Sequence, residues 1–120
     1  MNSLVPVIDA LAIDCAEPME LGRFWQHLLG GELRPCRDGD AELHGNSVRI
    51  DFLLTPVAKD GQKNRLHLDL AVPFDVHPEA IARALAFGAT KADDVYDGGD
   101  WQVLRDPEGN EFCIVWGGAE

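Results

Sequence analysis

One order of predicted elements occurs twice along the chain, and this repeat constrains the fold more than any other feature. In the first half, residues 7–14 form a short apolar run. Residues 18–29 then carry apolar side chains at helical spacing, and Gly30 and Gly31 end the predicted helix. Turn sequences follow at residues 38–40 and at Gly45-Asn46, and they separate three more predicted strands: residues 33–37, 41–44 and 47–54. The first half therefore has the order β-α-β-β-β.

The second half repeats that order after a polar linker at residues 55–64. Its predicted elements are a strand at 65–72, a helix at 78–87 ended by Gly88, and strands at 90–95, 101–105 and 111–116. Duplication of one module explains the repeat. The two modules span about residues 5–54 and 65–117, and together they form a single domain, residues 1–120. We predict an α+β fold whose two βαβββ modules form a curved, cup-shaped mixed sheet with the helices outside. Concave surfaces of this kind bind small molecules.

Charge and cysteine content narrow the function further. The chain has 21 acidic and 10 basic side chains and a formal net charge of -11, which repels nucleic acids and anionic membrane surfaces. Its three cysteines, Cys15, Cys36 and Cys113, are odd in number and form no C-x-x-C pair, which argues against a disulfide framework. We therefore expect a cytoplasmic protein with no nucleic-acid or membrane partner.

Three segments carry a family resemblance: ELGRFWQHLLGG at residues 20–31, NRLHLDLAV at 64–72 and DPEGNEFCIVW at 106–116. Set in the repeated β-α-β-β-β order, they resemble the vicinal oxygen chelate superfamily of glyoxalases, bleomycin-resistance proteins and dioxygenases, and within it the glyoxalase-like branch. The resemblance covers nearly the whole chain and implies the fold predicted above. It does not fix an activity, because this superfamily includes isomerases, dioxygenases, transferases and proteins that only bind.

The resemblance also implies where a metal would bind in metal-dependent members: one ligand on the first strand, a His on the first strand of the second half, and a Glu on the last strand. Here those positions hold Ala10, His67 and Cys113. Alanine cannot coordinate, and a Cys with a His suits hard divalent ions poorly. Asp9 is expected to point to the opposite face from Ala10, because strand side chains alternate. We expect no cofactor and no stoichiometric divalent metal.

His67 and Asp69 are the candidates for catalysis or ligand binding, because positions i and i+2 of a strand share a face. Such a pair can act as a general base, it can hydrogen-bond a ligand, or its two side chains can simply hydrogen-bond each other. Cys113 is expected on the interior face together with Glu111. Both residues are ligand-binding candidates. We expect Cys113 to line the pocket rather than act as a nucleophile, since the sequence places no cation or helix N-terminus beside it.

Two more ligand-binding candidates lie elsewhere. Trp101 opens a strand after the polar loop 97–100, where an aromatic ring can stack on a planar ligand. Arg49 lies on an otherwise apolar strand, from which it either orients an anionic ligand or points into solvent. The remaining histidines are expected at surface positions: His27, His44 and His77.

Three functions are consistent with these residues. The first is a glyoxalase-like small-molecule-binding protein with a degenerate metal site. The second is a lyase, isomerase or dioxygenase-type enzyme that uses His67 as acid/base or as ligand of a rearranged metal site with Asp69, Glu111 or Asp51. The third, a module that binds another protein, lacks the long exposed apolar run it would need. We expect a homodimer, and whether the cup closes within one chain or across the dimer stays open.

Overall fold

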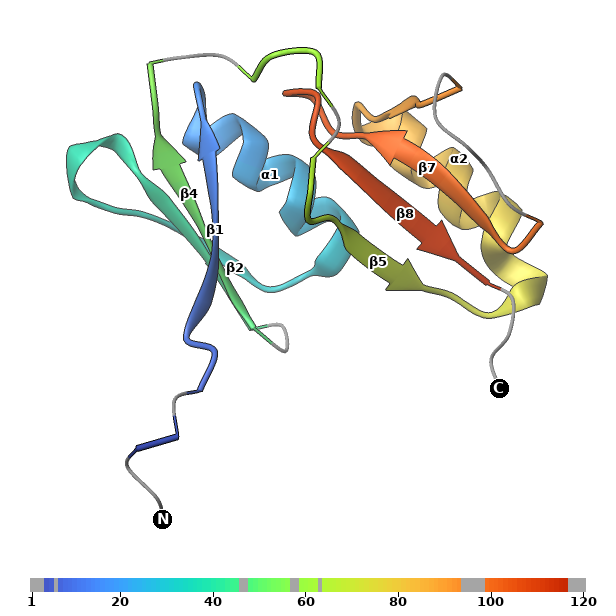
Figure 1. Cartoon of the computed structure of the whole chain (residues 1–120), viewed down its shortest axis with the longest axis horizontal. Helices are drawn as coiled ribbons and strands as arrows, with labels where there is room; N and C mark the ends of the chain where they lie inside the picture. Colours follow the sequence, from blue (N-terminus) through green and yellow to red (C-terminus); the bar gives the residue numbers. More distant parts are fainter. Residues whose placement is uncertain are drawn as a thin grey trace. The chain divides into compact units, whose positions relative to one another are not determined.

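The computed structural model describes residues 4–5, 7–45, 48–56, 59–62, 64–93 and 99–116. The chain forms two compact units, Met1–Ala58 (unit 1) and Lys59–Glu120 (unit 2), so the boundary falls inside the predicted linker. Each unit holds a four-stranded sheet and an α-helix (Figure 1). This confirms the α+β class and the two βαβββ modules.

Unit 1 has the predicted element order, with small shifts at the ends. Its elements are β1 (Ala10–Cys15), α1 (Pro18–Leu29), β2 (Glu32–Pro35), the 3₁₀ turn η1 (Arg37–Gly39), β3 (Ala41–His44) and β4 (Arg49–Leu54). The strand order is β1-β4-β3-β2, in which β1 runs parallel to β4 and the other pairs are antiparallel. The first strand begins at Ala10 instead of residue 7, and Asn46 of the predicted turn lies outside the described residues.

The core of unit 1 lies between α1 and one face of this sheet. Leu21, Phe24 and Trp25 of α1 are buried, as are Leu43 and Phe52 of the sheet. The helix approaches closely at Gly22, where a Cβ atom would meet the side chains of Leu33 and Phe52. The opposite face of the sheet carries Ala10, Arg49 and Asp51, since Ala10 pairs with Arg49 and alternate residues share a face.

Unit 2 repeats the topology strand for strand. Its elements are β5 (Leu68–Ala71), the 3₁₀ turn η2 (Phe74–Val76), α2 (His77–Phe87), β6 (Thr90–Lys91), β7 (Trp101–Arg105) and β8 (Glu111–Val115). The order β5-β8-β7-β6 matches that of unit 1, again with the outer pair β5 and β8 parallel. The strand predicted at 90–95 is only two residues long, and residues 94–98, including Gly98 of the predicted break, lie outside the described part.

The sheet of unit 2 has two different faces. Leu104, Phe112 and Ile114 are buried on one face, and α2 packs against β8. The other face, which we call the Cys113 face, follows from the register pairs: Trp101 with Val115, Val103 with Cys113, Arg105 with Glu111, and Asp69 with Cys113. The candidate site residues of unit 2 lie on this face. Among the described residues, neither helix is long and apolar enough to cross a membrane.

Candidate functional site on the Cys113 face of unit 2

The parallel pairing of β5 with β8 brings three chemically active side chains together. Asp69 is the register partner of Cys113, and His67 immediately precedes β5, two residues before Asp69. The His67 Nε2 atom lies 3.2 Å from Asp69 Oδ1. One donor atom from each of His67, Asp69 and Cys113 lies within 4.8 Å of the other two. The predicted shared face of these three residues is therefore what the structure has.

These three side chains differ in burial. The Cys113 residue is 6% exposed, while the side chains of His67 and Asp69 are 33% and 58% exposed. The thiol therefore lies at the base of the group, and the imidazole and carboxylate keep freedom to rotate. The structure places the His67 imidazole beside the Cys113 thiol, a neighbour that the sequence did not show.

An apolar cluster surrounds the thiol. Ala92, Val103 and Cys113 form a buried cluster, and Trp101 and Val115 pack against it. Trp101 is thus half-buried against the apolar part of the face, next to its register partner Val115. The Cys113 face combines a buried apolar cluster with a polar pair, His67 and Asp69, at one edge.

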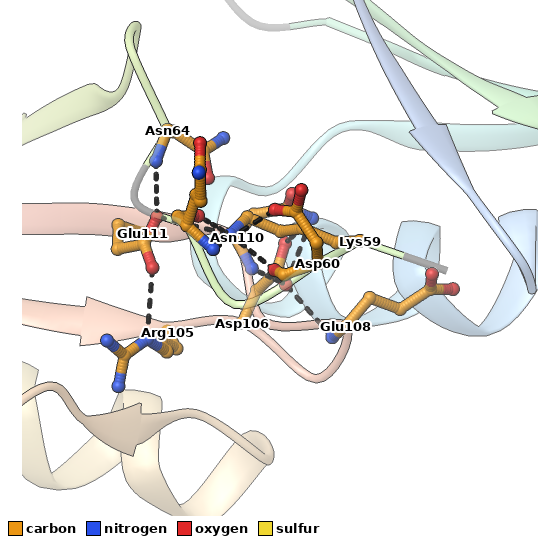
Figure 2. A network of polar contacts seen from close by, with 9 residues as sticks. Lys59, Asp60, Asn64, Arg105, Asp106, Glu108, Asn110 and Glu111 are labelled. Atoms are coloured by element: carbon orange, nitrogen blue, oxygen red, sulfur yellow. Dashed lines mark hydrogen bonds and ion pairs between the residues drawn. The ribbon is translucent and has the colours of Figure 1, made fainter. Parts of the chain in front are cut away.

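Glu111 lies on the same face, but its carboxylate is already bound by neighbouring donors (Figure 2). It accepts hydrogen bonds from the backbone N–H of Asn64 at 2.8 Å and from Arg105 Nε at 3.0 Å, and Lys59 Nζ lies 3.7 Å away. Burial alone would raise the pKa of Glu111, but these hydrogen bonds and the Lys59 charge outweigh burial and hold its pKa below the ordinary 4.5. The carboxylate stays ionised at neutral pH and fixes Lys59 and Asn64 to β8.

Asn64 and Asp106 belong to the same polar network as Glu111. Asn64 has a buried side-chain oxygen, Oδ1, without a hydrogen-bond partner among the described residues. Asp106 is buried and accepts hydrogen bonds from the backbone N–H groups of Glu108 and Asn110 at 2.9 Å each (Figure 2). These hydrogen bonds to Asp106 hold the DPEGN turn, and β8 starts directly after this turn.

Arg49 belongs to unit 1, and its charge is satisfied there. Its guanidinium donates to Asp51 at 2.8 and 3.2 Å and to Asp9 at 3.2 Å. Hydrogen bonding to Asp51, although opposed by desolvation, raises the pKa of Arg49 above its ordinary value. An arginine held by two carboxylates has little capacity left for an anionic ligand.

The contact with Asp9 corrects one prediction. Asp9 was expected to point away from the face that carries Ala10, but its carboxylate binds Arg49, the register partner of Ala10. The physical reason is that β1 begins only at Ala10, so the alternation of a strand does not yet apply at Asp9. Even so, Ala10 itself provides no donor atom, so the three-position metal site of metal-dependent relatives does not fit this chain.

A further polar pair on the same face of unit 1 was not predicted from the sequence. Nε2 of His44, predicted to be a solvated surface residue, lies 2.7 Å from Glu42 Oε1, and Glu42 is the register partner of Asp51. Both side chains are about two-thirds buried. The alternation in the segment Ala41–His44 was the available signal, because it places Glu42 and His44 on one face.

Comparison with known proteins identifies the family. A family model described as a glyoxalase-like domain matches residues 10–115. A search of curated proteins finds no match. Among solved structures, a mutant of the fosfomycin resistance protein FosX from Listeria monocytogenes, in complex with manganese(II) and a dihydroxypropylphosphonic acid, has a TM-score of 0.76 at 12% identity, over 97% of this chain and 94% of that one.

Two more solved structures have similar folds. A glyoxalase/bleomycin resistance protein/dioxygenase family enzyme from Burkholderia phytofirmans PsJN has a TM-score of 0.70 at 20% identity, over 88% of this chain and 94% of that one. A glyoxalase-related enzyme from Fulvimarina pelagi has a TM-score of 0.68 at 15% identity, over 93% and 88% of the two chains. At these identities the similarity concerns the fold alone, whereas the family model covers both modules. The chain belongs to the glyoxalase-like domain family of the vicinal oxygen chelate superfamily.

Proposed function

We propose that this protein binds a small molecule on the Cys113 face of unit 2. The observation that carries the proposal is the combination of an apolar cluster and a polar pair on one face: Val103, Cys113, Val115 and Trp101 beside His67 and Asp69. The apolar cluster excludes water from the body of a ligand, and the polar pair orients it. Trp101 contributes ring area for a planar group.

Asn64 supports the same proposal. A buried acceptor without a donor costs about 1–3 kcal/mol, and a ligand N–H or O–H at Oδ1 would remove that cost. The neighbouring cations do not supply an anion site, because Arg105 and Lys59 both pair with Glu111. The preferred ligand is therefore neutral or basic, with an apolar body and a hydrogen-bond donor.

The alternative function is catalysis by His67. A carboxylate oxygen 3.2 Å from an imidazole nitrogen orients the ring, which is an arrangement that suits a general base. In that case Asp69 positions His67, and His67 moves a proton on the bound substrate. This chemistry uses only residues of this chain and belongs to the lyase or isomerase class.

We also propose that the protein is a cytoplasmic homodimer. The three cysteines are all free thiols, which suits a reducing compartment. The net charge of -11 argues against nucleic acid or membranes as partners. Size-exclusion chromatography with light scattering measures the subunit count directly.

The experiment is native mass spectrometry of the purified chain, followed by calorimetric titration of the small molecule that co-purifies. We expect His67→Ala to weaken binding by about 1–3 kcal/mol, the cost of leaving a polar ligand group unpaired, with a smaller change in unfolding free energy. His27→Ala, an exposed histidine of α1, is the matched control and leaves binding unchanged. Recovery of the ligand in a chemically altered form would instead indicate catalysis by His67.

Normal binding by a His67→Ala protein that unfolds several kcal/mol more easily would contradict the proposal. It would make His67 a structural residue.

A further inference from the structure

We propose that Cys113 is a nucleophilic thiol that forms a covalent adduct with a neutral electrophile of the α,β-unsaturated carbonyl class. The sequence alone shows no base beside Cys113, and for that reason this residue was expected only to line the pocket. The structure supplies the base, because a ring nitrogen of His67 lies within 4.8 Å of the Cys113 sulfur. The proposal rests on the small-molecule site proposed above for the position of the electrophile, and it names the chemical class of that ligand.

The three side chains provide a nucleophile, a base and a carboxylate that orients the base. His67 Nε2 lies 3.2 Å from Asp69 Oδ1, and Asp69 is the register partner of Cys113. The same three roles occur together in enzymes that activate a serine or a cysteine. The thiol and the imidazole are up to 4.8 Å apart, and such contacts are often loose before a ligand binds. A small rotation of the partly exposed His67 side chain closes this distance.

The surroundings of Cys113 make the base necessary. The thiol lies in the apolar cluster described above, and apolar surroundings disfavour a free thiolate. Other charged groups on this face do not help, because Arg105 and Lys59 both pair with Glu111. His67 therefore takes up the thiol proton as the sulfur attacks.

The addition balances without any further reactant. As the Cys113 sulfur bonds to the β-carbon of the alkene, the thiol proton moves to the His67 imidazole. The π electron pair of the alkene shifts toward the carbonyl group, and His67 then returns the proton to the α-carbon. The product is a thioether that keeps every atom of the thiol and the alkene. Asp69 acts as a positioning residue, since it holds the ring during both proton transfers.

Two features of the face select the electrophile. The Asp69 carboxylate lies within 4.8 Å of the thiol, and together with the net charge of -11 it repels an anion. A conjugated carbonyl group is planar, and the Trp101 ring beside the apolar cluster offers it a flat surface to pack on. The preferred electrophile is therefore neutral and planar.

The test measures how fast acrylamide, a neutral α,β-unsaturated amide, alkylates each thiol of the reduced full chain, by mass spectrometry of its peptides. Cys36 is the exposed internal reference. Desolvation and then the charge of Glu42 raise the pKa of the Cys36 thiol, so it should react slowly. At neutral pH we expect Cys113 to react at least about 10-fold faster than Cys36, and His67→Ala to slow Cys113 by about 10–100-fold, as loss of a general base does.

Chemical rescue separates the role of His67 as a base from a structural role. Free imidazole should restore part of the Cys113 rate in His67→Ala, which it would not do if the histidine only packed. Asp69→Asn should slow Cys113 less than His67→Ala does. His27→Ala, at an exposed position of α1, is the matched control and should leave the rate unchanged. Circular dichroism checks folding, and if His67→Ala does not fold, Asp69→Asn, at an exposed position, still tests the proposal.

A Cys113 that reacts no faster than Cys36, an unchanged rate in His67→Ala or Asp69→Asn, or no rescue by imidazole would each overturn the proposal. These rates need no co-purified molecule, so they are independent of the calorimetric titration. An unreactive Cys113 in a protein that still binds its small molecule overturns the nucleophile alone. A reactive Cys113 in a protein that binds no small molecule overturns the proposed binding function and supports the nucleophile.

Discussion

Substitution of Glu111 by Gln should destabilise unit 2 in a pH-dependent way. Glu111 is 3% exposed and accepts hydrogen bonds from Asn64 and Arg105, with Lys59 nearby. Gln has nearly the same shape, but it is uncharged and turns an NH₂ group toward one of the two donors. Hydrogen bonds to charged groups contribute about 1.5–3 kcal/mol and neutral ones about 0.5–1.5, so the combined loss at neutral pH is about 2–3 kcal/mol.

The pH dependence follows from the lowered pKa of Glu111. A carboxyl whose pKa is lower in the folded state stabilises the fold fully above its unfolded-state pKa of 4.5, and this contribution is lost as the pH falls through the folded-state value. The stability difference between wild type and Glu111→Gln should therefore be constant near neutrality and shrink progressively below 4.5.

Urea unfolding of both proteins at a series of pH values measures this difference. Glu79→Gln, at an exposed position of α2, is the control and should show a small effect. A difference that stays the same at low pH would show that the substitution disturbs packing and that the charge on Glu111 does not stabilise unit 2.

The remaining predictions concern the turns that position the strands. Gly31→Ala should lower the unfolding free energy by on the order of 3 kcal/mol in thermal or urea unfolding, because Gly31 has φ +94° and a Cβ there would overlap the backbone oxygen of His44. Gly30→Ala should cost only about 1–2 kcal/mol by the same assay, because Gly30 has φ +76° but open space around it. Asp106→Ala should cost about 2 kcal/mol by the same assay, because it leaves the N–H groups of Glu108 and Asn110 without their acceptor, and an unchanged midpoint would contradict the assigned turn.

Local patterns predicted most of the fold. The helix predicted after Pro18 and the strands at 41–44 and 101–105 match α1, β3 and β7, because apolar periodicity and turn residues act over a few positions. The strand predicted at 90–95 is only β6, Thr90–Lys91. A strand depends on its pairing partner, and sequence pattern alone does not show how far that pairing extends.

The candidate site was predictable only within single strands. Alternation places His67 with Asp69 and Glu111 with Cys113, and the structure adds the register that sets Asp69 beside Cys113. The partners of Arg49 and Glu111 could not be predicted. Arg49 binds Asp9, which lies 40 positions away in the sequence, and Asn64 donates to Glu111, which lies 47 positions away. Contacts of this range depend on the finished fold.

Methyl-resolved NMR tests within single strands whether the ligand binds on the Cys113 face. Val103 and Leu104 are neighbours on β7 whose side chains point to opposite faces, as are Val115 and Ile114 on β8. On addition of the co-purified small molecule, we predict shifts of the Val103 and Val115 methyl signals and little change at Leu104 and Ile114. Shifts confined to Leu104 and Ile114, or absent from all four residues, would contradict binding on the Cys113 face.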